Sequence, residues 1–415
     1  MITLLNYWIA LNLLFTPIAY LPASSDSNKF VVAQQKLTTT DVPDGAVDSF
    51  GRSISLSADG GTALIKVGWD DEKGDSSRFV YIFTRAADGT WTQSVKLTPE
   101  DETSKSDFGS SLSLSADGSA ALIGDYIKDN ALIFIHAADG TWKQQTELTA
   151  ADGEGGEYFG GSVSLSADGG TALIGAVWDD EKGRHSGSAY VFTRESNGTW
   201  MQQAKLTAAD GTTSAWFGNT LSLSADGRTA LIGAEQAGAA YIFTHTPDGT
   251  WKQQAKLLAA DGRYSNFFGS SVSLSADGKT ALIGAYQAEG NDGSSGSAYV
   301  FIRDTDNSWT QKTKLIGSND RYAARFGKTV FLSKDGRIAL INGASVNPYI
   351  FTCSSDGFWS QQAQMITDDG NSLGDTLALS AKGNIALIKG FDRNKNRNAV
   401  YVFTDFVQPN STPKP

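Results

Sequence analysis

The chain has 415 residues, of which 40% are hydrophobic, so it can bury a large core and is not a disordered chain. Its 45 Asp and Glu outnumber its 34 Lys and Arg and give a net charge of -11. An acidic surface repels phosphate backbones, which excludes nucleic acid as the expected partner. Because Cys353 is the single cysteine, no intramolecular disulfide can form and packing must hold the fold together.

The first 23 residues differ in composition from the rest of the chain. Met1 to Tyr20 is mostly apolar, and small residues follow from Ala23 to Ser25. This pattern is typical of a signal peptide cleaved near Ala23, although no Lys or Arg precedes the apolar run. Its length also fits an uncleaved membrane anchor, and a misassigned start site would give the same pattern. We expect a signal peptide or N-terminal anchor over 1–23 and a linker over 24–29.

The leader predicts where the protein acts. A cleaved signal makes it secreted, and otherwise we expect a cell-surface or periplasmic location. Membrane contact would then occur only through an uncleaved anchor, because no later segment is apolar for long enough to cross a bilayer.

A Phe-Gly pair recurs along the chain and marks an internal repeat. The successive spacings of 58, 51, 58, 51 and 58 residues indicate duplication of a two-repeat unit. A degenerate seventh copy, Leu373-Gly374, follows 47 residues after the sixth pair. The six pairs are Phe50-Gly51, Phe108-Gly109, Phe159-Gly160, Phe217-Gly218, Phe268-Gly269 and Phe326-Gly327.

Each repeat contains four strand-like segments, most clearly in the fifth copy. Residues 271–275 alternate small polar and apolar side chains, and Ala276-Asp277-Gly278 then supplies turn chemistry. Residues 280–285 and 298–302 are continuous apolar runs, as expected for strands that are covered on both faces. These runs predict three strands joined by short connections.

The fourth strand is clearest in the preceding copy, at residues 251–257. Simple alternation puts Trp251, Ala255 and Leu257 on one face, which we expect to be buried. The opposite face would carry Lys252, Gln254 and Lys256, and such lysines protect an outer strand from unwanted pairing.

Seven units of four antiparallel strands predict an all-β fold, a seven-bladed β-propeller, with a linear β-solenoid as the alternative. The last repeat ends at residues 399–404 without an outer strand, and residues 30–37 resemble the missing one. We therefore expect the N-terminal strand to close the ring. The propeller would span 30–406 and leave a flexible C-terminal tail over 407–415.

The repeat resembles the FG-GAP repeat of integrin α-chain propellers and of many exported bacterial proteins. The Phe-Gly pairs and the Gly-Ala pairs, as at Gly175-Ala176 and Gly233-Ala234, carry the resemblance. The bacterial subtype is matched by the strand from Gly187 to Thr193 and by the following run from Trp200 to Leu206. The resemblance implies a seven-bladed propeller outside the cytoplasm with a binding or adhesive role.

The calcium loops of this family are not matched. Calcium-binding members carry Asp-x-Asp-x-Asp-Gly between the first two strands, where this chain has Ser57-Ala58-Asp59-Gly60 and its equivalents. One carboxylate per turn cannot supply the six to eight oxygens that calcium prefers. We expect no cofactor, with calcium implied only by the resemblance, and we interpret as turn residues Asp59, Asp117, Asp168, Asp226 and Asp277.

The chain offers no distinctive catalytic set, so we expect a protein that is not an enzyme. His136 and His245 occupy a repeat position that other copies fill with arginine or with Cys353, and His185 is alone in a loop. No nucleophile motif, phosphate loop or metal-ligand spacing is present. The repeated tryptophans of the fourth strands are expected to pack between blades rather than to stack on sugars.

The loops joining strands 2–3 and 4–1 vary in length and chemistry, whereas the turns on the other face are uniform. Binding residues concentrate in loops on a rigid scaffold, so the variable face is the predicted ligand face. Trp69 and Trp178 could instead simply pack their own loops. The candidate ligand-binding residues are Trp69, Asp70, Asp71, Glu72, Trp178, Asp179, Asp180, Glu181, Tyr158, Trp216, Phe267 and Tyr286.

These patterns predict an exported, monomeric, non-enzymatic binding or adhesion module. It would present one loop-rich face to an extracellular protein or glycan. The alternatives are a carbohydrate-active enzyme, a lyase or hydrolase on a propeller scaffold, and a purely structural surface repeat protein.

Overall fold

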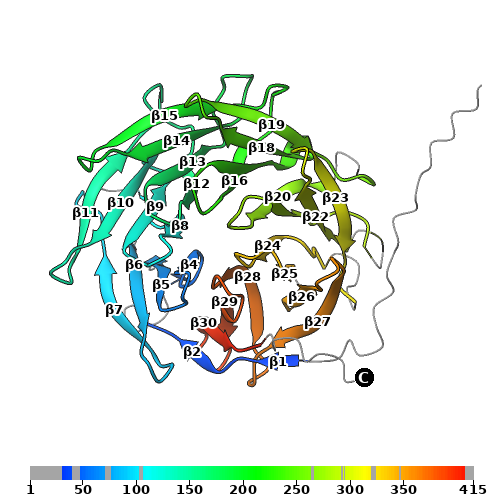
Figure 1. The fold of residues 1–415 in the computed structure, drawn as a ribbon. Helices are drawn as coiled ribbons and strands as arrows, with labels where there is room; N and C mark the ends of the chain where they lie inside the picture. The colour runs from blue at the N-terminus through cyan, green and yellow to red at the C-terminus, as the bar shows by residue number, and fades with distance from the viewer. Residues whose placement is uncertain are drawn as a thin grey trace, which may run out of the picture.

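A computed structural model describes residues 30–39, 47–70, 76–101, 106–262, 266–290, 293, 295–318, 324–344 and 347–406. The predicted leader over 1–23, the linker over 24–29 and the tail over 407–415 lie outside these residues. Within them, the strands form seven antiparallel blades around a central axis, with the first strand of each blade innermost (Figure 1). This arrangement confirms the seven-bladed β-propeller and excludes the solenoid.

The first four blades follow one another in chain order, each with its strands in sequence order from the axis outwards. Blade 1 has a short inner edge made by β3 (Val47–Asp48) and β4 (Ile54–Leu56), followed by β5 (Thr62–Asp70), β6 (Ser76–Arg85) and β7 (Trp91–Leu97). Blade 2 contains β8 (Ser111–Leu114), β9 (Ala120–Asp125), β10 (Asn130–His136) and β11 (Trp142–Leu148). Blade 3 contains β12 (Phe159–Leu165), β13 (Thr171–Ala176), β14 (Ser188–Arg194) and β15 (Trp200–Leu206). Blade 4 contains β16 (Phe217–Leu223), β17 (Thr229–Ala234), the 3-10 helix η1 (Glu235–Ala237), β18 (Ala239–His245) and β19 (Trp251–Leu257).

The last three blades complete the ring. Blade 5 contains β20 (Phe268–Leu274), β21 (Thr280–Ala285), β22 (Ser297–Arg303) and β23 (Trp309–Leu315). Blade 6 contains β24 (Thr329–Leu332), β25 (Ile338–Asn342), β26 (Tyr349–Cys353), β27 (Trp359–Ile366) and, on its outer edge, β1 (Phe30–Val32). Blade 7 contains β28 (Ser372–Leu379), β29 (Ile385–Asp392), β30 (Arg397–Thr404) and β2 (Gln35–Leu37).

The predicted alternation of the outer strand is wrong, because a β-bulge interrupts it. In blade 4 the pairing passes from Phe243 with Gln253 to Ile242 with Ala255, so Gln254 has no partner. The extra residue reverses the alternation of every side chain before it. Trp251 therefore shares a face with Lys256, and Lys252 shares the other face with Ala255 and Leu257.

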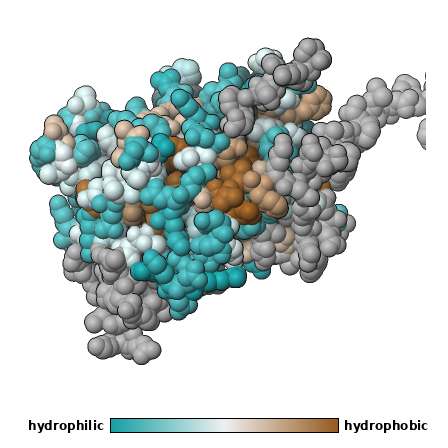
Figure 2. Space-filling model, turned by 90° about the horizontal axis from the view of Figure 1, so that it is seen from below, coloured by the Kyte–Doolittle hydropathy of each residue, from teal (hydrophilic) through white to brown (hydrophobic). Residues whose placement is uncertain are grey.

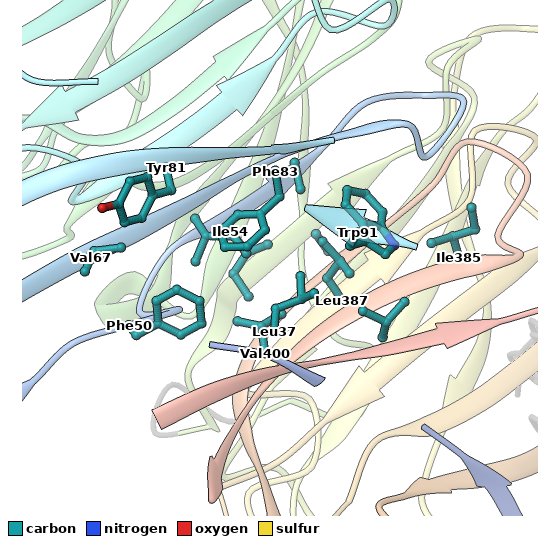
Figure 3. Close-up of a cluster of buried hydrophobic side chains, with 14 of the residues drawn as sticks. Leu37, Phe50, Ile54, Val67, Tyr81, Phe83, Trp91, Ile385, Leu387 and Val400 are labelled. Carbon is teal, nitrogen blue, oxygen red and sulfur yellow. The ribbon is translucent and has the colours of Figure 1, made fainter. Parts of the chain in front are cut away.

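The two faces of each blade are buried against its neighbours. Trp251 packs with Phe243 towards blade 3, whereas Leu257 packs with Phe268 towards blade 5. The tryptophans therefore lie between blades, as the sequence predicts. The contact between blades 7 and 1 has the same character and joins Leu37, Leu387 and Val400 to Phe50 and Trp91 (Figure 3).

The N-terminal segment closes the ring, as predicted, but through two strands rather than one. β2 completes blade 7 and pairs Lys36 with Tyr401, in the register that Lys314 and Tyr299 adopt in blade 5. β1 instead adds a parallel fifth strand to blade 6, with Val31 opposite Met365. The segment thus ties the last two blades together, and in Figure 1 its blue ribbon lies beside the orange and red C-terminal strands.

The rim that carries β1 and β2 is mostly hydrophilic, with a hydrophobic patch beside residues drawn in grey (Figure 2). Phe30 and Val32 of β1 are among the large hydrophobic side chains exposed in the described residues. The outer face of β1 therefore contributes little to the core.

The turns between the first two strands of the blades, which are Ser-Ala-Asp-Gly in blades 1 to 5, Ser-Lys-Asp-Gly in blade 6 and Ser-Ala-Lys-Gly in blade 7, link the blades by a closed ring of backbone hydrogen bonds. In each described turn the amide of the second residue donates to the carbonyl of its equivalent in the next blade, and Ala381 closes the ring by donating to Ala58 at 2.9 Å. The Asp59 carboxylate accepts a hydrogen bond from Ser57 and another from the amide of Gly61, as expected of a turn residue. In order, the seven residues are Ala58, Ala116, Ala167, Ala225, Ala276, Lys334 and Ala381.

Candidate functional site

The loops joining strands 2–3 and 4–1 lie on one face of the disc, which we call the loop face. Backbone hydrogen bonds join them directly: Trp178 donates to Glu157 at 3.0 Å and Phe217 to Ser186 at 3.0 Å. The variable loops expected to share a face therefore do so and support one another.

A lysine of the outer strand anchors the 4–1 loop that enters its blade. Lys205 pairs with Asp152 at 2.6 Å, and Lys256 pairs with Asp210 at the same distance. The ammonium groups of Lys205 and Lys256 also lie over the rings of Tyr190 and Tyr241. The bulge places these lysines on the tyrosine face, so they hold the loop in place instead of merely protecting an edge.

The carboxylates of the 2–3 loop in blade 3 are engaged within the chain. Asp179 is buried and accepts hydrogen bonds from Ser188 and Tyr190, while Lys205 lies 2.8 Å from it. Burial is the largest influence and acts to raise the pKa of Asp179, but the hydrogen bonds from Lys205, Ser188 and the Glu181 amide, together with the Lys205 charge, hold that pKa below its usual range. Glu181 also pairs with Lys205, at 2.9 Å. These two predicted site residues therefore shape the loop.

Asp180 lies in the same loop and is exposed. Its carboxylate accepts a hydrogen bond of 2.6 Å from the amide of His185. Ligand contact by Asp180 stays a prediction.

Four bulky residues occupy equivalent positions directly before Phe-Gly, and we call them the inner collar. They lie just before the innermost strands of blades 3 to 6, which are β12, β16, β20 and β24. These strands surround the axis in Figure 1. The backbones of the collar residues are left-handed, which costs a residue with a side chain roughly 1–2 kcal/mol. Strained backbone of this kind clusters at functional sites. The members and their φ angles are Tyr158 at 60°, Trp216 at 58°, Phe267 at 55° and Arg325 at 55°.

Tyr158 of the inner collar belongs to a continuous series of ring contacts, of which two are stacked and the one with Trp178 is tilted by 39°. The centroid of the Tyr158 ring lies 4.9 Å from that of Tyr126 and 3.8 Å from that of Trp178. The Trp178 ring in turn lies 5.0 Å from the ring of His185. The ring faces of Tyr158 and Trp178 are thus covered by other side chains of the protein. The hypothesis that Trp178 packs its own loop fits this geometry. A ligand that stacks flat on this series would contact the rings at its two ends, Tyr126 and His185.

Of the remaining predicted aromatics, Trp216 and Phe267 belong to the inner collar, and Tyr286 lies beside Phe267. Phe267 and Tyr286 are stacked at 4.9 Å with an interplanar angle of 20°. Trp216 is half-buried, and its amide donates to the carbonyl of His185 at 3.3 Å. The structure therefore brings Tyr158, Trp216, Phe267 and Tyr286 to one part of the loop face.

The remaining candidates are on or beside blade 1. Trp69 and Asp70 end β5 and pair with Asp48 and Val47 of β3, but their side chains lie outside the described part of the structure. Asp71 and Glu72 lie outside the described residues altogether.

The sequence reasoning did not select Tyr126, His185, Glu235 and Arg325. Glu235 follows Gly233-Ala234 directly, at the position that Tyr286 occupies in blade 5. Its half-buried side chain has a pKa raised to about 7 by burial. The available signal was positional: the residues after Gly-Ala and before Phe-Gly vary while their neighbours repeat.

A charged cluster occupies the loop face between blades 1 and 2. Lys66 replaces the glycine of the repeat, is fully buried and pairs with Asp107. Arg78 lies 3.8 Å from the same carboxylate. Burial lowers the pKa of Lys66 against the opposing pull of Asp107. Because Lys66 is enclosed by the protein and already paired with Asp107, we interpret this pair as structural and not as a ligand site.

The opposite face is less uniform than its turns suggest. A cavity of about 370 Å³ opens there between blades 3 and 4. Its lining includes Glu195, Asp226, Arg228, His245 and Trp251. His245 and Trp251 are cross-strand partners whose rings lie 5.6 Å apart, so the position shared by the two histidines supports packing.

Among the described residues, no three His, Cys, Asp or Glu side chains lie together in a way that could hold a metal ion. The same residues contain no helix long and apolar enough to cross a membrane.

Comparison with known proteins identifies the repeat. The FG-GAP repeat family model matches residues 91–133, 142–192, 200–243 and 251–301. No curated protein sequence matches the chain. The family matches fall in blades 1 to 5, where the repeat is most regular.

Solved propellers resemble the chain in fold alone. The periplasmic gluconolactonase of Pseudomonas aeruginosa has 17% identity and a TM-score of 0.52, over 75% of this chain and 84% of that one. The β-propeller domain of Myceliophteria thermophila Cps50 (Swd1) has 13% identity and a TM-score of 0.56, over 89% and 99%. Kuenenia stuttgartiensis hydrazine synthase has 13% identity and a TM-score of 0.56, over 90% and 99%. The repeat matches and the ring of blades together show that the chain is an FG-GAP repeat protein folded as a seven-bladed β-propeller.

Proposed function

We propose that this protein is an exported, non-enzymatic binding module that captures an extracellular glycan or protein on the inner collar of its loop face. The observation that carries the proposal is the collar itself. Three consecutive blades place a bulky aromatic residue, Tyr158, Trp216 or Phe267, in a left-handed backbone that favours glycine or asparagine. A residue that costs stability at a loop-face position is better explained by ligand contact than by folding.

The scaffold supports this role. Lys–Asp pairs of 2.6 Å hold the 4–1 loops that lead to the collar in blades 3, 4 and 5. A binding site on such loops loses little conformational entropy when a ligand binds. The apolar leader over 1–23 supports export, and we propose that the ring acts as a monomer without a resident cofactor.

The test compares capture on an array of oligosaccharides and extracellular proteins by three forms of the purified chain. Replacing Trp216 and Phe267 together by asparagine keeps a residue that tolerates the left-handed backbone and removes both rings. The control, Phe358→Asn, removes a 59% exposed aromatic ring from a 3–4 turn on the opposite face. We expect the double variant to lose at least tenfold in signal and the control to match the parent. Equal capture by all three would remove the collar from consideration.

The enzyme alternative has one observation in its favour. Glu235, with its pKa near 7, could exchange a proton at neutral pH. Hydrolysis of a glycosidic bond needs a second carboxyl group about 5–9.5 Å away. Mass spectrometry of a captured oligosaccharide distinguishes the two functions, since a binding module returns it unchanged and an enzyme returns shorter products.

A further inference from the structure

The carboxylate of Glu235 has no partner among the residues that the structure describes. Glu235 begins η1 at the end of β17, where it is half-buried on the loop face. Its side chain makes no hydrogen bond or ion pair with any described residue, and burial is what acts on it. Half-burying a carboxylate without a partner is costly, and a cation supplied from outside would offset that cost.

Two aromatic side chains of blade 5, Phe267 and Tyr286, lie near this carboxylate. Gly269 packs against the backbone of Ala234, which brings the start of blade 5 and hence Phe267 beside Glu235. In blades 2 and 3 the positions equivalent to Glu235 and Phe267 are occupied by Tyr126 and Tyr158, whose rings stack on each other. Tyr286 stacks on Phe267 and is within electrostatic reach of Glu235. A carboxylate beside aromatic rings suits a cationic group, because the ring faces also attract positive charge.

The charged groups described around Glu235 do not pair with it. Arg325 is exposed and acts on Tyr286, but it forms no ion pair with Glu235. Among the described strands, β18 and β20 pack against η1, and their first two residues carry no titratable side chain. With a net charge of -11, the molecule also attracts basic partners from a distance.

We propose that Glu235, Phe267 and Tyr286 form a site for a lysine side chain presented by a basic segment of a partner protein. This rests on the proposed function and specifies its partner. A lysine ammonium fits better than an amino sugar, because with an ordinary pKa of about 10.4 it stays charged throughout the range in which Glu235 ionises.

The experiment uses ligand-observed NMR titrations of the full chain with a capped Gly-Gly-Lys-Gly-Gly peptide. The same peptide with Nε-acetyl-lysine removes the charge and keeps the alkyl chain. The protein variants are Glu235→Gln, which is isosteric, and Glu195→Gln as a control at an exposed carboxylate on the opposite face. Each pair is measured at pH 6 and pH 8.

We expect the lysine peptide to bind, and acetylation or Glu235→Gln to weaken binding about tenfold, with no change in the control. Between pH 6 and pH 8 affinity should rise roughly tenfold as Glu235 ionises. Equal binding of the acetylated peptide, unchanged binding to Glu235→Gln or a flat pH dependence would overturn the inference. In that case, loss of array capture by the Trp216 and Phe267 variant would still leave the proposed function standing.

Discussion

Removing one amide from the ring of hydrogen-bonded turns between the first two strands of the blades tests whether that ring stabilises the propeller. The change is Ala381→Pro, which deletes the donor of the 2.9 Å hydrogen bond to Ala58. Residue 381 is the second residue of its turn, because Gly383 donates to Ser380. Proline is favoured at that position, so the turn itself should tolerate the change.

A matched substitution isolates the hydrogen bond. Ala87 is the second residue of an equivalent turn, closed by the bond from Gly89 to Ala86, but it is exposed and its amide makes no backbone hydrogen bond to any described residue. Ala87→Pro should stabilise the protein by about 0.4–1 kcal/mol through the unfolded chain. Ala381→Pro gains the same stabilisation but removes the donor of the Ala58 carbonyl, and leaving that carbonyl unpaired costs about 1–3 kcal/mol.

We therefore expect Ala381→Pro to be less stable than Ala87→Pro by about 1–3 kcal/mol. Urea denaturation followed by tryptophan fluorescence measures this difference, and an unchanged m-value shows that both variants unfold from the same state. Equal stability of the two proline variants would refute the idea that the ring of backbone bonds contributes to closure.

Further predictions concern the closing strand, the buried carboxylate and the cysteine. Leu37→Ala removes a side chain buried between blades 7 and 1 and should cost about 2–5 kcal/mol, whereas Phe30→Ala, at a 55% exposed position of β1, should change stability by less than about 0.5 kcal/mol. Comparable losses in urea denaturation would contradict closure by β2. The raised pKa of Glu235 disfavours the folded state increasingly as pH rises from about 4.5 to 7, so Glu235→Gln should gain about 3 kcal/mol at pH 8 and almost nothing at pH 4; a gain independent of pH in thermal melts would contradict this. Burial raises the pKa of the Cys353 thiol, so at pH 8 it should react with maleimide more slowly than free cysteine, and an equal rate would show that the site is open.

The repeat made the architecture predictable, because each copy carries its own strand and turn signals. Thr280–Ala285 and Trp251–Leu257 are strands with the predicted bounds. Counting alternate residues did not predict which side chains of the outer strand share a face. The bulge at Gln254 follows from pairing with β18, and the short motif carries no glycine or proline to announce it.

The candidate site was predictable in place but not in detail. Variation before Phe-Gly located Tyr158, Trp216 and Phe267 correctly on one face. What those rings touch depends on side chains from the preceding blade, such as Tyr126, which lies 32 residues before Tyr158. Likewise, the burial of Glu235 arises from packing between blades 4 and 5, and no property of the local sequence distinguishes it from an exposed loop carboxylate.

The central claim is that ligand binds to the inner collar of the loop face. Hydrogen–deuterium exchange mass spectrometry, with and without the glycan or protein captured most strongly on the array, tests it most directly. The account predicts slower exchange in peptides covering residues 151–160, 209–218 and 258–270, with no change in those covering the Ser-Ala-Asp-Gly turns. Protection confined to the opposite face, around the cavity lined by Arg228 and Trp251, would contradict the account.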